Sequence, residues 1–476
     1  MPLTHFRDTL TTAASEGTLA AGLIGEGMMI PGLEGPVRMV YADFVASGRA
    51  MRQVEDFVAE HVLPFYANSH TEASYCGAYV TQLRREAREE IGRLVGASAE
   101  DVVIFAGSGA TAGLNRLVNL FGVNQAERPV VLVGPYEHHS NLLPWRESRA
   151  AVIEIPEGEA GGPDLGALER ALEKHAGSDL VIGAFSAASN VTGIITDPDP
   201  VTRLLKQYGA LSVWDYAGGG PYLPMDMGVG TGARKDAIVV SPHKFPGGPG
   251  ASGVLVVNGA AVRTENPTWP GGGTVEFVSP WRHDYVRDLS EREEAGTPNV
   301  IGDIRAALAF MIKDAVGSEA IAEREAQFNA MALEGWGDNN RLTLLGAENA
   351  HRLPVYSFLM HDGSGSYVEP QLVARILSDV YGIQSRGGCA CAGPYGHRLL
   401  GIGREHSEYI RQQLADGRMT FKPGWTRLNF SYLMDEATVR FIIDSVNDLS
   451  QRVDGLIGRY AFDKASGQFQ PVERAA

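Results

Sequence analysis

Short apolar runs alternate with helical segments between residues 102 and 257, and this alternation limits the folds open to the chain. The runs are rich in Val, Ile and Leu, a composition typical of buried strands. They lie at residues 102–105, 130–133, 151–155, 180–185, 211–214, 237–240 and 254–257. Segments with helical spacing, such as 165–174 and 200–208, separate several of them. Strands joined by helices form βαβ units, so we expect an α/β fold with a mostly parallel central sheet covered by helices.

The pattern changes near residue 298, where longer helices replace the alternation. Helices are predicted at residues 300–316 and 318–335, followed by strands at 353–360 and 428–431 and helices at 369–381 and 436–453. We interpret this region as separate α+β material. The predicted parts are an N-terminal arm at residues 1–36, a large domain at 37–298 and a smaller α+β domain with its linking helices at 299–476.

The charge and the cysteine content narrow the class of protein. The 476 residues carry 41 Lys and Arg against 57 Asp and Glu, a formal net charge of −16. Nucleic acids and anionic membranes attract basic patches, so we expect neither as a partner. The three cysteines, Cys76, Cys389 and Cys391, are too few for a disulfide framework and predict a cytoplasmic protein. We also expect no membrane-spanning helix and no signal peptide.

Lys244 stands in a glycine-rich stretch, residues 241–253, between two of the predicted strands. The stretch reads Ser-Pro-His-Lys-Phe-Pro-Gly-Gly-Pro-Gly-Ala-Ser-Gly. Glycine lets the backbone approach a ring or a phosphate closely, as around a lysine that carries a carbonyl cofactor as a Schiff base. The alternative is a glycine-rich hairpin with an exposed lysine, and the stretch alone leaves both interpretations open.

A second glycine-rich turn, residues 106–110, follows the predicted strand 102–105 and precedes a predicted helix at 111–120. Free amide groups at the start of a helix bind anions, and the Thr111 hydroxyl adds a donor. The turn lacks the Gly-Lys-Ser/Thr of a nucleotide-binding P-loop, so a single phosphate fits it better. A tight strand-to-helix turn without a ligand explains the motif equally well.

Polar residues at the carboxyl ends of two strands complete the set of candidate groups. Glu137, His138 and His139 follow the strand 130–133, at the edge where open α/β sheets bind ligands. One imidazole could stack on a cofactor ring, although adjacent histidines are also common in polar loops. The histidines and cysteines do not have zinc-ligand spacing, so we expect no metal. Asp215 directly follows an apolar run, and its carboxylate suits either a protonated pyridine nitrogen or the next turn.

The order of these motifs resembles the class V pyridoxal-phosphate enzymes of fold type I. The motifs that carry the resemblance are 106–110, Glu137-His138-His139, Ser189-Asn190-Val-Thr-Gly193, Asp215, 241–244, Gly271-Gly-Gly273 and Ala295-Gly-Thr297-Pro-Asn299. It covers about residues 38–450, and within the family the chain looks like the group II cysteine desulfurases and selenocysteine lyases. The resemblance implies pyridoxal 5'-phosphate as the cofactor, a small amino acid as the substrate and a homodimer with shared sites.

The resemblance also implies which residues hold the cofactor. Lys244 would carry it as a Schiff base, Asp215 would pair with its pyridine nitrogen, and His138 would stack on its ring. Asn190 would lie near the ring hydroxyl. The phosphate would be held by Thr111, Ser241 and His243, by the Ala110 amide, and by Thr297 of the neighbouring subunit.

For the substrate, the resemblance implies binding by Arg427, through the carboxylate, and by Arg386. Lys244 would move the α-proton, with His138 as a further catalytic group. Cys391 would take the substrate sulfur as a persulfide and release alanine, and a protein could then accept the sulfur. The alternatives are a class V aminotransferase, epimerase or C–S lyase that works without the thiol, and a non-catalytic cofactor-binding regulator.

Three departures from the family pattern bear on the reaction. Gly218 stands where the family has a glutamine beside the ring hydroxyl, and Cys389 and Ala390 replace two histidines before the nucleophile. The segment 395–422 is longer than usual and could close over a substrate. If the nucleophile loop is extended, Cys389 and Cys391 project to the same side. Cys389 would then either help to pass the sulfur on or fill the space of the histidine.

Overall fold

The computed structural model describes residues 2–69, 72–418, 421–463 and 467–472, and among these no helix is both long and apolar enough to cross a membrane. Internal contacts group the chain into two units whose segments interleave. Unit 1 comprises Met1–Ile24, Ser47–Ser189 and Ile195–Ala320, and unit 2 comprises Gly25–Ala46, Asn190–Ile194 and Ile321–Ala476. The predicted arm at 1–36 contributes to both units. The domain boundaries at residues 36 and 298 stay predictions.

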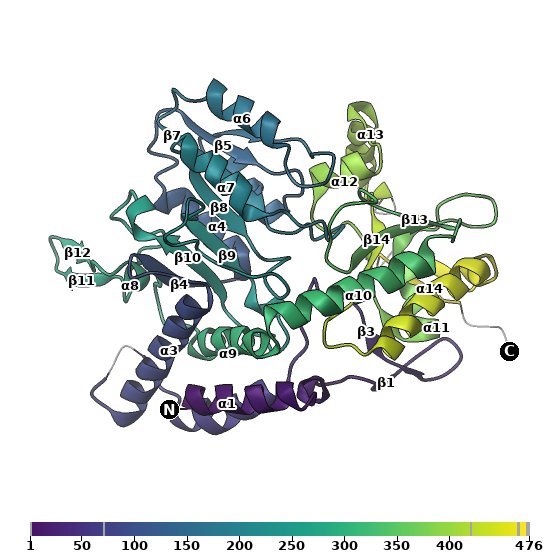
Figure 1. Cartoon of the computed structure of the whole chain (residues 1–476), viewed down its shortest axis with the longest axis horizontal. Coiled ribbons are helices and arrows are strands. Elements are labelled where there is room, and N and C mark those ends of the chain that lie inside the picture. The colour runs from purple at the N-terminus through teal and green to yellow at the C-terminus, as the bar shows by residue number, and fades with distance from the viewer. Residues whose placement is uncertain (1, 70–71, 419–420, 464–466, 473–476) are drawn as a thin grey trace. The chain divides into compact units, whose positions relative to one another are not determined.

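Unit 1 is built on a seven-stranded sheet with the strand order β4-β10-β9-β8-β7-β5-β6 (Figure 1). Its strands are β4 (Asp101–Gly107), β5 (Pro129–Val133), β6 (Ala151–Glu154), β7 (Leu180–Ser186), β8 (Leu211–Asp215), β9 (Ala237–Val240) and β10 (Gly253–Asn258). β10 runs antiparallel to both of its neighbours, whereas the other pairs are parallel. Each predicted apolar run forms one of these strands, so the mostly parallel sheet is confirmed.

Several helices of unit 1 pack against this sheet. The helices of unit 1 are α1 (Pro2–Ser15), α2 (Arg52–Phe57), α3 (Tyr75–Leu94), α4 (Gly109–Leu120), α5 (Leu143–Arg146), α6 (Leu165–Lys174), α7 (Pro198–Gln207), α8 (Leu289–Glu293) and α9 (Val300–Val316). α4 lies close to β9 because Gly113 has no side chain, and a Cβ atom there would lie 3.0 Å from Val239 Cγ1. Leu117 of α4 and Leu255 of β10 are buried in the core that results.

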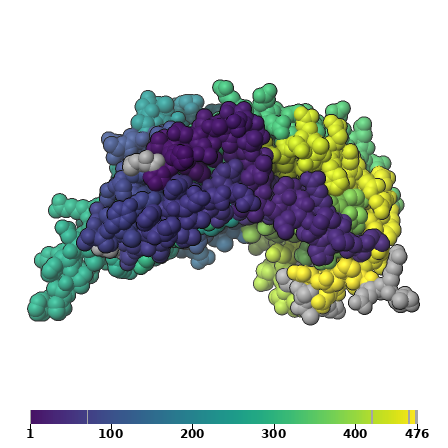
Figure 2. All heavy atoms as spheres, turned by 90° about the horizontal axis from the view of Figure 1, so that it is seen from below, coloured from purple at the N-terminus to yellow at the C-terminus, as the bar shows by residue number. Residues whose placement is uncertain are grey.

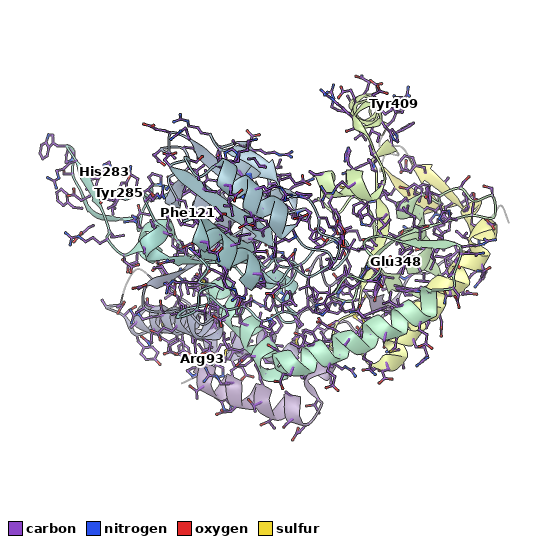
Figure 3. The ribbon with its side chains drawn as sticks, turned by 45° about the horizontal axis from the view of Figure 1, so that its top comes forward. Arg93, Phe121, His283, Tyr285, Glu348 and Tyr409 are labelled. Atoms are coloured by element: carbon purple, nitrogen blue, oxygen red, sulfur yellow. The ribbon has the colours of Figure 1, made fainter. Side chains whose placement is uncertain are left out.

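Two peripheral elements of unit 1 contrast in how they are packed. α1 is held by its buried face, where the Phe6 ring lies 5.1 Å from that of Phe57. In Figure 2 the purple N-terminal residues lie over the blue residues of this unit. The hairpin formed by β11 (Val275–Val278) and β12 (His283–Tyr285) instead projects outward, as Figures 1 and 3 show. Trp281, between its strands, is 89% exposed.

Unit 2 is an α+β structure, as predicted. Its four-stranded antiparallel sheet has the order β13-β14-β17-β16. The main elements are β13 (Leu342–Leu344), β14 (Val355–Met360), β16 (Arg386–Gly388), β17 (Trp425–Asn429), α11 (Pro370–Tyr381), α14 (Glu436–Ile457) and most of α10 (Ser318–Trp336). The core between sheet and helices contains the packed rings of Trp336, Tyr356 and Phe430. This core places β16 and β17, which carry the predicted substrate-binding arginines, side by side.

Smaller elements of unit 2 surround these strands. β3 (Val40–Tyr41) pairs in parallel with β15 (Ile383–Gln384), which fixes the segment that follows β3 beside the chain leading into β16. α12 (Gly393–Leu399) and α13 (Arg404–Ala415) follow β16. Tyr409, labelled on α13 in Figure 3, is 50% exposed. The extra segment predicted at 395–422 thus consists largely of these two helices.

Candidate active site

Lys244 lies in the short 3-10 turn Pro242–Lys244, which directly follows β9. Lys244 N donates to Ser241 O at 3.0 Å, which closes the turn. The chain can then fold back toward β10 because Gly248 has no side chain, and a Cβ atom there would lie 1.9 Å from Pro242 O. The backbone of the lysine is therefore fixed, while its side chain is only partly buried.

The carboxylate of Asp215 is buried at the end of β8, the strand next to β9. Its Oδ1 accepts a hydrogen bond from Ala217 N at 2.7 Å. Burial raises the pKa of Asp215, and the Lys244 charge acts in the opposite direction. A cation close to Asp215 therefore favours the ionised carboxylate, and a protonated pyridine nitrogen is a cation of the required kind.

The turn between β4 and α4 forms one side of a small polar cradle. Gly109 has a φ of +64°, and a Cβ atom there would lie 2.8 Å from Ser241 Oγ and 3.0 Å from His243 Cε1. Ala110 N donates to Ser241 Oγ at 2.9 Å, so this predicted phosphate donor is bonded within the cradle itself. Burial, with the Lys244 charge, lowers the pKa of His243 to about 4, so its ring is neutral at pH 7.

The histidine turn after β5 contributes the other side of the cradle. Thr111 Oγ1 lies 2.7 Å from Ser140 Oγ, and Ser140 N donates to His138 Nδ1 at 3.1 Å. Because Nδ1 accepts this bond, the neutral ring of His138 carries its proton on Nε2. Ser140 was not among the predicted residues. Ser140 lies two residues after His138, in a turn that faces a predicted phosphate-binding helix. This position could have indicated its role from the sequence.

Glu137 is a buried carboxylate to which the sequence assigned no role. Its Oε1 accepts Ser186 N at 2.9 Å, and its Oε2 accepts Ser186 Oγ at 2.7 Å and Asn141 Nδ2 at 2.5 Å. Burial raises the pKa of Glu137 to about 8 in spite of these donors, and the Asp215 charge adds to the rise. Ser186 is the sheet partner of Asp215. Glu137 therefore ties the His138 turn to the strand ends that hold Asp215.

Thr297 lies in the turn before α9, and its side chain is exposed. Asn299 starts the helix, since its Oδ1 accepts Gly302 N at 3.2 Å. The turn thus has a defined structure that presents Thr297 to solvent. A role toward the phosphate of a neighbouring subunit stays a prediction.

In unit 2, the two predicted substrate-binding arginines share one carboxylate. Arg427 on β17 is 3% exposed at its side chain, and its Nη2 lies 2.7 Å from Asp43 Oδ1. Arg386 on β16 is 47% exposed, and its Nε lies 3.2 Å from Asp43 Oδ2. Arg427 Nη1 also donates to Asn190 O at 2.8 Å. The sequence did not single out Asp43, although an acid among the small and apolar residues that follow β3 is an available signal.

The loop after β16 carries the two cysteines. Asn190 Nδ2 donates to Ala390 O at 2.7 Å, which anchors the loop between them. Cys389 is partly buried and Cys391 is exposed, with a φ of 56°. This left-handed conformation is unusual for a residue with a Cβ atom. The loop is thus not extended at Cys391, and the condition under which the thiols of Cys389 and Cys391 would project to the same side is not met.

Asn190 belongs to this loop arrangement in unit 2 rather than to the polar cradle of unit 1. Its backbone carbonyl and its side-chain amide bond to Arg427 and Ala390, respectively. Its Oδ1 is buried and has no hydrogen-bond partner among the described residues. Such an acceptor costs free energy unless a donor reaches it. A ring hydroxyl would supply that donor, so the predicted role of Asn190 stays open to test.

Comparison with known proteins assigns the sequence to a family. The family model named "Aminotransferase class-V" matches residues 40–411. A probable cysteine desulfurase of Pyrococcus abyssi is 28% identical over 369 residues, covering 76% of this chain and 87% of that protein. Another, from Halalkalibacterium halodurans, is 26% identical over 361 residues, covering 75% of this chain and 84% of that protein.

Solved structures with the same fold agree. The apo cysteine desulfurase from Thermococcus onnurineus NA1 has a TM-score of 0.71 at 24% identity, covering 87% of this chain and 95% of that chain. Cysteine desulfurase CsdA from Escherichia coli has a TM-score of 0.66 at 22% identity, covering 87% of this chain and 94% of that chain. The predicted fold type I architecture is confirmed. The chain belongs to the aminotransferase class-V family.

Proposed function

We propose that the chain is a pyridoxal 5'-phosphate-dependent cysteine desulfurase that transfers sulfur from L-cysteine to Cys391 and releases alanine. Its family and the names of its relatives support a desulfurase. The observation that carries the proposal is the thiol itself, because Cys391 is exposed on a loop between β16 and α12. A small buried cysteine would instead be only a packing residue.

The groups in unit 1 fit the cofactor. A Cβ atom at Gly109 would fill the cradle, and Thr111, Ser241 and His243 surround it with hydroxyl and imidazole groups suited to a phosphate. Asp215 is a buried acid that needs a cation, and Lys244 offers the amine that binds an aldehyde. When bound, the cofactor supplies an electron sink for the substrate carbon.

Each protein group then has a defined task. Arg427 binds the substrate carboxylate and orients the amino acid, and Lys244 Nζ accepts the α-proton. The Cys391 thiolate attacks the substrate sulfur, so that an S–S bond forms as the C–S bond breaks. The electron pair of the broken bond stays with the substrate carbon, which takes up a proton. L-cysteine and the thiol become alanine and a persulfide, with no further oxidant or reductant.

The test is alanine release from L-cysteine by Cys391→Ser, with mass spectrometry of the intact protein. We expect the wild type to release alanine and gain one sulfur atom, and the variant to do neither while keeping the cofactor absorbance. Cys76→Ser, which removes a partly buried thiol elsewhere, is the matched control. Full desulfuration by Cys391→Ser would overturn the proposal. Pyruvate and ammonia would then indicate a C–S lyase, and dependence on an oxo acid an aminotransferase.

The proposal includes a homodimer in the cytoplasm whose persulfide is passed to an acceptor protein. The exposed turn that carries Thr297 supports a shared site, because a neighbouring subunit can reach it. We expect Thr297→Ala to weaken cofactor retention in dialysis. A monomer with full cofactor occupancy in dilute solution, measured by sedimentation and absorbance together, would contradict the shared site.

A further inference from the structure

Arg116 is a charged residue buried within α4, the helix that follows the cradle turn. Its side chain is only 5% exposed, although a guanidinium group stays charged in proteins. Its Nη1 donates to Ala106 O at 3.1 Å and to Ala112 O at 3.3 Å. These two carbonyl groups flank residues 107–111, which form one side of the cradle. One guanidinium group therefore joins the two ends of this turn.

The charge of Arg116 is only loosely paired with Glu293 of α8. Glu293 is buried, yet its Oε2 lies 3.7 Å from Arg116 Nε and accepts no hydrogen bond from the residues that the structure describes. Its Oε1 accepts Thr268 N at 3.0 Å. Burying such a pair costs free energy that a long contact does not recover, and apolar side chains of similar size often stabilise a fold more. Stability alone therefore does not account for an arginine at this position.

The guanidinium group is held in place by residues outside the turn. Arg116 Nε and Nη2 both donate to Glu293 O at 3.4 Å. The Arg116 Cζ atom lies 4.3 Å from the centre of the Trp269 ring, within the range of a cation–π interaction. α8, which carries Glu293, contacts β4 and lies beside it in Figure 1. Arg116 is thus fixed independently of the turn and can stabilise one shape of it.

The turn needs such support because its backbone is rich in glycine. Gly107 and Gly109 both have a positive φ, 76° and 64°. Glycine gives a chain many alternative conformations, and ordering it costs entropy. In the observed conformation Ala110 N donates to Ser241 Oγ, so the turn is joined to the lysine stretch. A phosphate binds through several donors at once, and it binds more tightly when the protein already holds them in place.

We propose that Arg116 is a positioning residue, which holds the cradle turn in the shape that binds the phosphate of the cofactor. It acts through its hydrogen bonds to Ala106 O and Ala112 O. The inference rests on the proposed function, in which the cradle receives this phosphate. It adds that the preference for a phosphorylated cofactor depends on a buried residue of α4 outside the cradle.

The test compares the affinities of the full-length apoprotein for pyridoxal 5'-phosphate and for pyridoxal, which lacks the phosphate, by titration calorimetry. The ratio of the two dissociation constants is the phosphate preference. For Arg116→Met, which keeps an apolar stem, we expect this preference to fall about tenfold with unchanged affinity for pyridoxal. A general loss of stability would weaken the binding of both compounds alike. Arg234→Met is the matched control, because Arg234 bonds to Asp101 at the opposite end of β4.

A second variant is needed because Arg116→Met leaves the Glu293 carboxylate buried without its counter-ion. The double variant Arg116→Met with Glu293→Gln lacks both charges of the pair and should show the same fall in phosphate preference. If Arg116→Met does not fold, the double variant decides. Glu293→Gln alone keeps the bonds from Arg116 to the turn, so its preference should be at least that of the wild type. An equal fall in Glu293→Gln would overturn the inference, because the loss would not come from Arg116.

An unchanged phosphate preference in the Arg116 variants would also overturn the inference. If the wild type prefers the phosphorylated compound in that experiment, the cradle stands and only the role of Arg116 is wrong. If the wild type binds both compounds equally, the proposed phosphate site is wrong as well. Neither titration involves sulfur transfer, so the result does not depend on the Cys391 test.

Discussion

The proposed cofactor residues in unit 1 and the proposed substrate residues in unit 2 are stabilised in opposite ways. In unit 1, Asp215 and Glu137 are buried at strand ends, and burial raises the pKa of each. In unit 2, Arg427 is buried and is paired with Asp43. Burial thus disfavours the charge of Asp215 in unit 1, whereas the charge of Arg427 in unit 2 has a counter-ion 2.7 Å away.

The two arrangements suit different ligands. A buried acid whose ionised form is disfavoured by burial is stabilised by a cationic ring for as long as the ring stays protonated. An arginine already paired with a carboxylate gives up less free energy when it takes a second one, so substrate and product can exchange. Variants in unit 1 should therefore affect cofactor retention, and variants in unit 2 should affect substrate binding.

The largest effect is expected from Lys244→Ala in unit 1. Loss of the amine that moves the α-proton should lower turnover of L-cysteine by about 10⁴-fold. The variant should keep part of its cofactor through Asp215 and the cradle, measured by absorbance after gel filtration. Reduction of the wild type with borohydride should fix the cofactor on the peptide that contains residues 241–244. Its recovery on another lysine would refute the assignment.

Arg427→Lys in unit 2 should have the next largest effect. Lysine keeps the charge but cannot donate through two nitrogens at once to Asn190 O and to carboxylates. We expect kcat/KM for L-cysteine to fall about 100-fold, mostly through KM, while cofactor content is unchanged. Arg375→Lys, in another arginine–carboxylate pair of unit 2, controls for general effects on this unit. Loss of cofactor from Arg427→Lys would contradict the expectation that variants in unit 2 affect substrate binding alone.

A smaller effect is expected from Gly109→Ala, which tests whether the cradle has room for a side chain at this position. The added Cβ atom would press on Ser241 Oγ and His243 in a backbone with a φ of +64°. We expect the affinity for pyridoxal 5'-phosphate to fall about tenfold in a titration of the apoprotein. Gly209→Ala has a similar φ, +68°, with no neighbour within 4 Å. Gly209→Ala should lower the stability of the fold by a similar amount but leave the affinity for pyridoxal 5'-phosphate unchanged. If both variants lose the same affinity, the clash with Ser241 and His243 is not the cause.

The last prediction concerns the pH dependence of stability through Glu137 and not the binding of cofactor or substrate. Its pKa rises on folding from 4.5 to about 8, so in this range the folded protein keeps a proton that the unfolded chain has released. The contribution of this group to stability is therefore present at low pH and lost as the pH rises to about 8. After cofactor removal, the wild type should lose stability relative to Glu137→Gln over this range in denaturant unfolding. If the difference in unfolding free energy between the wild type and Glu137→Gln stays constant with pH, Glu137 does not hold a proton in the folded state. Glu89→Gln, at an exposed position, is the control.

Most of the fold could be predicted because its signals are local. The helix at 300–316 was predicted with the bounds that the structure gives, and each short apolar run became a strand of the large sheet. β17 shows where local signals fail. It was predicted at 428–431 but spans Trp425–Asn429. A charge at Arg427 interrupts the apolar pattern, and only the distant partner Asp43 makes a buried arginine acceptable in a strand.

The same limit applies to the proposed site. Motif order gave Lys244, Asp215 and His138, because each directly follows an apolar run or a turn that can be read locally. Asp43 was missed, since its partner Arg427 lies 384 residues away in the chain and no spacing rule connects them. The backbone of Cys391 was missed for another reason. A left-handed φ is expected of glycine, and nothing in a Cys-Ala-Cys sequence predicts it.

The hydrogen bond from Ala110 N to Ser241 Oγ also orders events during synthesis of the chain. It joins residues 131 positions apart, so the cradle turn emerges from the ribosome long before the residue that completes it. Lys244 arrives three residues later still, and β10 after that. A nascent chain that ends before these residues contains the segments of the α4 turn and the histidine turn but not Lys244. Under the proposed function, attachment of the cofactor to Lys244 therefore requires that more than half of the chain has been made.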